Sequence, residues 1–258
     1  MNLEEMKKHE WLVSWSGGKD STATIILMHE HGIPIKEIIY VRMMYDDALP
    51  ATLPVMTEFV DSAKEVFESW GYPVRIVKSI RTAVDELNTV YKRSKYPERN
   101  GKKHGVANFI RGYCSMTKNK MDTIAKCIPA DGQYEMIGYA ADETSRTHRL
   151  GGFKQSIMVE LGINEIETFE ICRKYNLLSP LYELGFARDG CWFCPSTSKK
   201  EREYLRENYP ELVQKINEMC DMCEFDLSMF KHSGRNHWVE DWLKEKELST
   251  KEIRNETL

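Results

Sequence analysis

The sequence lacks long apolar runs and has little net charge. No stretch of about 18 or more apolar residues is present, so no transmembrane helix and no membrane partner are expected. The N-terminus, M-N-L-E-E-M-K-K-H-E, is too acidic and polar for a secretory signal, which favours a cytoplasmic protein. With a net charge of −4 over 258 residues, the chain has no overall positive field of the kind that marks nucleic-acid-binding proteins.

Internal repeats and low-complexity segments are also absent. Apolar residues make up 41% of the chain, which is enough for the core of one large domain, or of one domain with a small annex. Seven cysteines are present, and two C-x-x-C pairs occur among them. Because disulfides are rare in the cytoplasm, metal binding or redox chemistry is a better explanation for these pairs than a disulfide framework.

The first third of the chain alternates between strand and helix patterns. Short apolar runs predict strands over residues 11–15, 37–43 and 73–78, and helical periodicity predicts helices over 21–31 and 54–70 between them. This order indicates an α/β fold in which a parallel sheet is flanked by helices.

Later segments extend this pattern and then change it. Strand character returns over residues 134–139, and the chain is charged and helical from Ser198 onward. We therefore predict one α/β domain over residues 1–185. Residues 186–258 are expected to form a cysteine-bearing turn with a helical C-terminal extension.

The turn S-G-G-K-D-S, Ser16–Ser21, lies between the first predicted strand and the first predicted helix. Two glycines allow a close approach to a phosphate, and the free N–H groups at a helix start attract anions. Lys19 adds a positive charge, and Asp20 could either cap the helix or hold Mg²⁺. The predicted nucleotide-binding set is Ser16, Gly17, Gly18, Lys19, Asp20 and Ser21. The spacing differs from the Walker pattern, which disfavours a kinase or GTPase.

S-G-G-K-D-S resembles the PP-loop of the ATP pyrophosphatase superfamily, also known as the adenine nucleotide α-hydrolases. The resemblance implies a Rossmann-like fold that binds ATP and cleaves it between the α and β phosphates. The segment G-Y-A-A-D-E-T-S-R is similar to a stretch that lies near the nucleotide in these proteins. It implies that Gly138, Asp142, Glu143 and Arg146 contact magnesium, phosphate or substrate. The resemblance thus makes Lys19, Asp20, Asp142 and Arg146 the candidate catalytic residues.

The motif G-C-W-F-C-P places Cys191 and Cys194 on a predicted tight turn, where both sulfurs could reach one metal ion. Cys114 is the best third ligand, although a small buried side chain is a competing interpretation. Cys220 and Cys223 are three residues apart on a predicted helix. One of them could be a fourth ligand or carry sulfur, and a Zn²⁺ site that includes both C-x-x-C pairs also fits the spacing.

The ordered set of motifs resembles the phosphoadenosine phosphosulfate (PAPS) reductase family over about residues 10–205. Several relatives use the equivalent cysteines for a [4Fe-4S] cluster, which implies Cys114, Cys191 and Cys194 as ligands, with Cys223 as the candidate fourth. Assimilatory reductases also carry a nucleophilic cysteine near the C-terminus, whereas this chain has no cysteine after Cys223.

The leading hypothesis is an ATP-dependent adenylating sulfurtransferase that forms AMP and pyrophosphate and uses an iron–sulfur cluster, with Zn²⁺ as the alternative metal. It requires a sulfur donor and an acceptor, which could be a small metabolite or a nucleic acid, and a partner subunit could supply a basic surface. The first alternative is a PAPS or adenosine phosphosulfate reductase. The second is a nucleotide-sensing subunit of a larger complex.

Overall fold

The computed structural model describes residues 1–110, 114–128, 132–224, 226–227 and 237–256. The chain forms two compact units, each assembled from three separate segments. The first unit contains Met1–Arg42, Thr52–Ile80 and Lys120–Asp189. The second contains Met43–Ala51, Arg81–Asn119 and Gly190–Leu258. The division predicted between residues 185 and 186 stays a prediction.

The first unit is built on a five-stranded sheet whose order is β3-β2-β1-β4-β5. All pairings are parallel, and Val13 of β1 stands between Ile38 of β2 and Met136 of β4. The predicted α/β fold with a parallel sheet is therefore confirmed. The strands are β1 (Trp11–Trp15), β2 (Ile35–Arg42), β3 (Val74–Lys78), β4 (Tyr134–Met136) and β5 (Lys154–Gln155).

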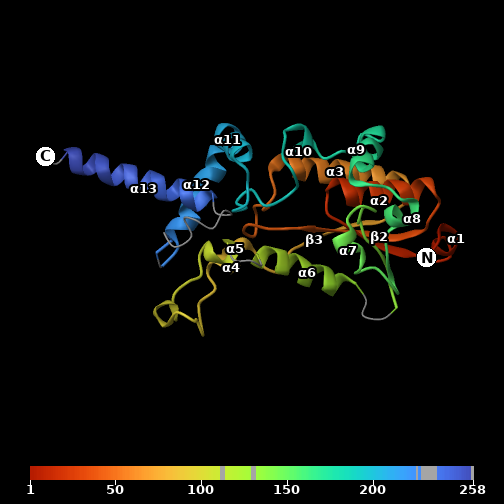
Figure 1. Cartoon of the computed structure of the whole chain (residues 1–258), viewed down its shortest axis with the longest axis horizontal. Coiled ribbons are helices and arrows are strands. Elements are labelled where there is room, and N and C mark those ends of the chain that lie inside the picture. Colours follow the sequence, from red (N-terminus) through yellow and green to blue (C-terminus); the bar gives the residue numbers. More distant parts are fainter. Residues whose placement is uncertain (111–113, 129–131, 225, 228–236, 257–258) are drawn as a thin grey trace. The chain divides into compact units, whose positions relative to one another are not determined.

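Helices cover the sheet of the first unit, as Figure 1 shows. Helices α2 and α3 lie on one side of the strands, and α9 and α8 pack on α2. Trp11 and Trp15 of β1 are fully buried, and the Trp15 indole donates to Thr22 of α2 at 2.9 Å. The remaining helices of this unit are short. The helices are α1 (Leu3–Met6), α2 (Lys19–Glu30), α3 (Pro54–Ser69), α7 (Thr144–Thr147), α8 (Ile157–Leu161), α9 (Glu165–Lys174) and α10 (Pro180–Glu183).

The second unit is mainly helical, and a helical C-terminal region is present as predicted. Helix α4 ends at Leu87, where Asn88 forms the C-cap. Residues 111–113, between α5 and α6, lie outside the described part. The helices are α4 (Ala83–Leu87), η1 (Pro97–Arg99), α5 (Ala107–Ile110), α11 (Lys199–Asn208), α12 (Pro210–Asp221) and α13 (His237–Glu256), and α6 (Ser115–Cys127) has residues in both units.

Among the described residues, no helix combines the length and apolarity needed to cross a membrane.

Candidate functional site

The turn Ser16–Ser21 lies at the carboxyl end of β1, where the strand order of the sheet reverses direction. β2 and β3 follow on one side of β1, and β4 and β5 lie on the other. In open parallel sheets, ligands bind beyond the carboxyl ends of the strands at such a switch point. The residues after β1 and those after β4 therefore occupy the position where this fold binds ligands.

The backbone of the turn requires glycine at position 17. Gly17 has φ +83°, a conformation that residues with a side chain rarely adopt. A Cβ there would also lie 3.1 Å from the Met56 methyl group. Gly18 has φ −78° and is the N-cap residue of α2. No side chain forms a capping hydrogen bond at this N-cap. The proposal that Asp20 caps this helix is therefore wrong, because Asp20 lies within the first turn.

The two serines of the motif brace the turn from within. The Ser16 N–H donates to the Ser21 hydroxyl at 3.0 Å, and the two hydroxyl oxygens lie 2.9 Å apart. Ser21 also donates to the Gly18 carbonyl at 3.1 Å, while the Gly18 N–H donates to Ser16 at 3.3 Å. These short-range bonds hold the loop in one conformation, so an anion can bind without first ordering it.

Lys19 is only 8% exposed and is held between two carboxylates. Its ammonium lies 2.7 Å from Asp20 and 3.6 Å from Glu165, and 5.4 Å from the centre of the Phe169 ring. Burial alone would lower the pKa of Lys19. The hydrogen bond to Asp20, with the charges of Asp20 and Glu165, outweighs this effect and raises the pKa. Lys19 therefore carries its positive charge throughout the neutral range.

One face of α9 contacts the loop, a feature that the sequence did not reveal. Glu165 pairs with Lys19, the Thr168 hydroxyl donates to Asp20 at 3.2 Å, and the Cys172 thiol donates to the Lys19 carbonyl at 3.3 Å. With Phe169, these positions follow the i, i+3, i+4, i+7 spacing of one helical face. The spacing was visible in the sequence, but nothing local showed that this face meets residue 19.

Tyr182 of α10 closes the loop from another direction. Its hydroxyl accepts a hydrogen bond from the Lys19 N–H at 3.3 Å. A Cβ on Gly18 would lie 3.5 Å from the same oxygen. Burial raises the pKa of Tyr182, so the phenol stays protonated. The Tyr182 oxygen thus occupies the place of an anion oxygen at one of the N–H groups of the helix start.

The segment after β4 also reaches the start of α2. A Cβ on Gly138 would lie 2.8 Å from the Ser21 Cα and N and 2.9 Å from the Asp20 carbonyl carbon. Gly138 is therefore needed for the close approach of two backbone segments. The Asp142 carboxylate accepts a hydrogen bond from the Glu165 N–H at 3.2 Å. This bond ties Asp142 to the helix start whose Glu165 side chain pairs with Lys19.

Arg146 has a more local set of partners. It forms an ion pair with Glu143 at 2.6 Å, and its guanidinium lies 4.2 Å from the centre of the Tyr139 ring. Glu143 in turn accepts from the Ala140 N–H at 3.2 Å. Burial lowers the pKa of Arg146, but its pairing with Glu143 raises it overall. Its role toward phosphate or substrate stays a prediction.

The candidate metal ligands all belong to the second unit. Cys191 and Cys194 share a tight turn in which the Cys194 N–H donates to the Cys191 carbonyl at 2.9 Å. Burial is the main cause that raises the pKa of Cys114. Residues 111–113, which directly precede Cys114, lie outside the described part of the chain.

Cys223 and Cys220 have different surroundings. The Cys223 thiol lies 3.9 Å from the His104 carbonyl, and a Cβ on Gly105 would lie 3.2 Å from its sulfur. Cys220 is 1% exposed, and burial raises its pKa to about 12. Within the described part of the chain, no three His, Cys, Asp or Glu side chains form a group placed to hold a metal ion. Cysteine thiols are suitable ligands for an iron–sulfur cluster or for Zn²⁺. The role of Cys114, Cys191, Cys194 and Cys223 as metal ligands stays a prediction.

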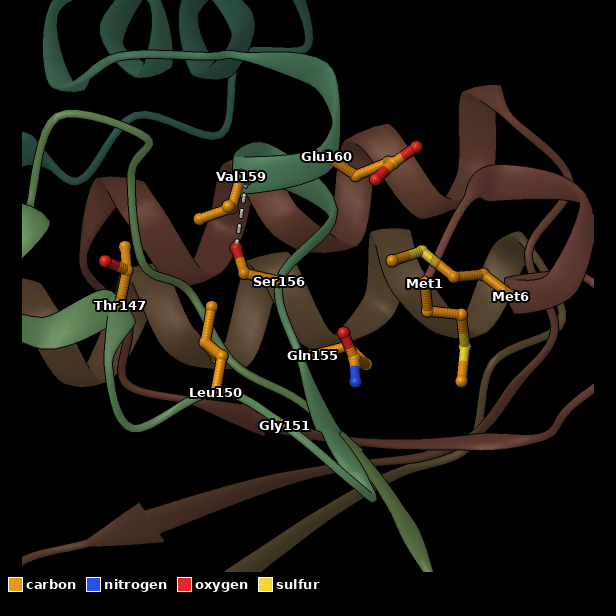
Figure 2. Close-up of a pocket in the computed structure, with 9 residues that line it drawn as sticks. All are labelled: Met1, Met6, Thr147, Leu150, Gly151, Gln155, Ser156, Val159 and Glu160. Carbon is orange, nitrogen blue, oxygen red and sulfur yellow. Dashed lines mark hydrogen bonds between the residues drawn. The ribbon is translucent and has the colours of Figure 1, made fainter.

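A separate pocket of about 300 Å³ opens in the first unit (Figure 2). No residue of the Ser16–Ser21 turn or of α9 lines it. Its lining residues are Met1, Met6, Thr147, Leu150, Gly151, Gln155, Ser156, Val159 and Glu160.

No protein-family model matches the sequence, and no curated protein matches it either. Among solved structures, the chain is similar to the U34-tRNA thiolase NcsA from Methanococcus maripaludis with its [4Fe-4S] cluster. The TM-score is 0.40 at 16% sequence identity, and the match covers 95% of this chain and 77% of that chain. A TM-score of this size carries no argument, so the proposals below rest on the residues of this chain.

Proposed function

We propose that the protein is an ATP-dependent adenylating enzyme that cleaves ATP to AMP and pyrophosphate and passes sulfur to an acceptor. The observation that carries the proposal is the preformed S-G-G-K-D-S turn at the switch point of the sheet. It combines Gly17 in a left-handed conformation, the N–H groups at the start of a twelve-residue helix, and the charged, buried Lys19.

In the proposed reaction, an acceptor oxygen attacks the α-phosphorus of ATP, and the bond from the α-phosphorus to the bridging oxygen breaks. Pyrophosphate leaves with the electron pair of that bond. The turn N–H groups and Lys19 stabilise the charge that develops on this leaving group. A sulfide-level sulfur donor then attacks the activated carbon of the acceptor, forms a carbon–sulfur bond and displaces AMP. The enzyme mainly supplies placement and charge.

Lys19 must exchange partners for this to happen. Its ammonium is held by Asp20 and Glu165, so a bound pyrophosphate group would take the place of one carboxylate. Mg²⁺ bound with the nucleotide would offset phosphate charge, and Asp20 is the carboxylate of the turn suited to hold it. Asp142 is proposed to steady the start of α9 during this exchange, because it already bonds the Glu165 N–H.

The proposal includes an iron–sulfur cluster, with Zn²⁺ as the alternative metal. Its proposed ligands are Cys114, Cys191 and Cys194, with Cys223 as the candidate fourth. Its support is chemical, because Cys114, Cys191 and Cys194 are partly exposed thiols of one unit. A bound cluster could supply sulfur. No step above depends on it.

The sulfonucleotide reductase alternative requires a thiolate nucleophile on Cys220 or Cys223. Burial of Cys220 holds its pKa near 12, so this thiol is not a thiolate at neutral pH. Only Cys223 then remains for that reaction.

The test is isotope exchange between labelled pyrophosphate and ATP, together with identification of the nucleotide product. We expect exchange and AMP in the presence of an acceptor, and Lys19→Gln should lower the exchange rate by about 10²–10³. Lys36→Gln removes an exposed lysine of the same unit and serves as the control. Formation of ADP and phosphate, or an unchanged rate in Lys19→Gln, would refute the proposal.

A further inference from the structure

The second unit carries a basic hairpin, defined here as residues 90–103, that differs sharply in charge from the rest of the protein. It contains six lysines and arginines and one acidic residue, in a chain whose net charge is −4. In Figure 1 it is the yellow segment that extends away from α4 and α5. The six cations are Lys92, Arg93, Lys95, Arg99, Lys102 and Lys103.

Backbone hydrogen bonds hold this hairpin in a defined conformation. The Tyr91 N–H donates to the Lys102 carbonyl at 3.0 Å, and the Gly101 N–H donates back to Tyr91 at 2.9 Å. Val90 and Lys103 form an antiparallel bridge at its base. At the tip, the Arg99 N–H donates to the Tyr96 carbonyl at 3.0 Å. The cations are thus displayed from an ordered support.

Half of the cations in the hairpin have no carboxylate partner among the residues that the structure describes. Lys92, Arg93 and Lys95 are exposed, and no described carboxylate pairs with any of them. The acidic groups at the hairpin are Glu98, whose carboxylate lies 4.0 Å from the Arg99 guanidinium, and Glu224, which accepts from the Lys103 backbone N–H. An unpaired cluster of this kind attracts a polyanion.

The tip also presents an aromatic ring. Tyr96 is 44% exposed, although a tyrosine can bury much of its surface in a core. Arg99, which is only 5% exposed, lies with its guanidinium 4.2 Å from the centre of the Tyr96 ring. This contact orients the ring while one part of it stays open. An exposed ring among cations is suited to stacking on an unpaired base.

We propose that the basic hairpin is a docking surface for nucleic acid, with Lys92, Arg93 and Lys95 contacting phosphates and Tyr96 stacking on an unpaired base. This proposal rests on the proposed function only in one respect, namely that the docked nucleic acid would carry the sulfur acceptor. The binding of nucleic acid to the hairpin is itself independent of ATP. An anionic phospholipid surface would satisfy the cations but would not use the ordered, ring-bearing tip.

The experiment measures binding of the full chain to a stem–loop RNA, a single-stranded DNA and a duplex DNA of equal length, over a series of salt concentrations. Lys92→Gln, Arg93→Gln and Lys95→Gln are combined in one variant. The control combines Lys36→Gln, Lys126→Gln and Lys200→Gln, which removes the same charge from exposed positions elsewhere.

We expect wild-type protein to bind RNA or DNA, and the hairpin variant to bind roughly tenfold more weakly. Its slope of log affinity against log salt should fall by about 2, because each lost single-strand phosphate contact contributes about 0.7. The control should match the wild type. Equal affinities and slopes for the two variants, no binding to any of the three nucleic acids, or tighter binding to anionic phospholipid vesicles would each overturn the proposal.

A second variant tests the ring. Tyr96→Ala should weaken binding to unpaired segments by about tenfold, and Tyr96→Phe should restore it, because stacking needs the ring and not the hydroxyl. Equal binding by Tyr96→Ala and wild type would remove the stacking role. ATP affinity, measured by calorimetry without nucleic acid, should be normal in all hairpin variants. If the wild-type protein binds RNA but shows no pyrophosphate–ATP exchange, the proposed function is refuted and the hairpin proposal stands.

Discussion

Gly138→Ala tests whether the segment after β4 positions the nucleotide turn. The added methyl carbon would lie 2.8 Å from the Ser21 Cα and N and 2.9 Å from the Asp20 carbonyl carbon, where ordinary contacts begin at 3.4 Å. All three atoms are backbone, so no side-chain rotation relieves the overlap. The start of α2 or the segment at Gly138 must move by about 0.6 Å.

This movement should affect stability and ligand binding together. Overpacking of this kind lowers the free energy of unfolding by about 1–3 kcal/mol. Because the displaced atoms belong to the turn itself, ATP affinity should fall by about tenfold to a hundredfold. The two quantities are measured by urea denaturation and by titration calorimetry with ATP and Mg²⁺.

Gly190→Ala is the matched control for this substitution. A Cβ at Gly190 meets no atom within 4 Å, and neither glycine has a positive φ. The control should therefore keep both wild-type stability and wild-type ATP affinity. Wild-type ATP affinity in Gly138→Ala would refute the inference that this contact sets the position of the turn.

Three further outcomes are expected. Tyr182→Phe frees the Lys19 N–H for an anion, so calorimetry should show pyrophosphate binding about twofold to tenfold tighter; weaker binding would contradict the placement of the phenol oxygen at an anion position. Burial raises the pKa of Asp241, but Arg206 and Arg202 outweigh this effect, so the pKa is lowered overall. The stability that the Asp241 carboxylate supplies is therefore present above about pH 3.8 and is lost as the pH falls further. In urea denaturation, Asp241→Asn should cost about 1–3 kcal/mol at pH 7 and progressively less below pH 3.8; an equal loss at all pH values would contradict this. Cys191→Ser should lower the iron and sulfide content of protein purified without oxygen, and retention of both would remove Cys191 as a ligand.

The elements around the turn could be predicted because their signals are local. The strand β1, the turn Ser16–Ser21 and the helix α2 follow one another directly along the chain. Strand β5 gave no such signal, because a strand of two residues has no measurable periodicity.

The partners of the turn could be predicted only in part. Gly138 was a candidate through its motif, but its purpose, a backbone contact with Ser21, depends on the pairing of β1 with β4. Tyr182 lies 163 residues after Lys19 and was not a candidate at all. Contacts at this separation depend on the strand order and on which helix face meets the sheet.

The sequence by itself determined the parallel α/β class, the glycine-containing turn between β1 and α2 and the helical C-terminal region, since each depends on the order and spacing of nearby residues. The tertiary structure alone decided that the chain folds into two units of three segments each and that α9 and Tyr182 enclose Lys19. It also decided that the basic hairpin is ordered, with Lys92, Arg93 and Lys95 exposed. The physical reason is that local propensities act over a few residues. Strand order and the pairing of buried charges are settled only when distant segments pack together.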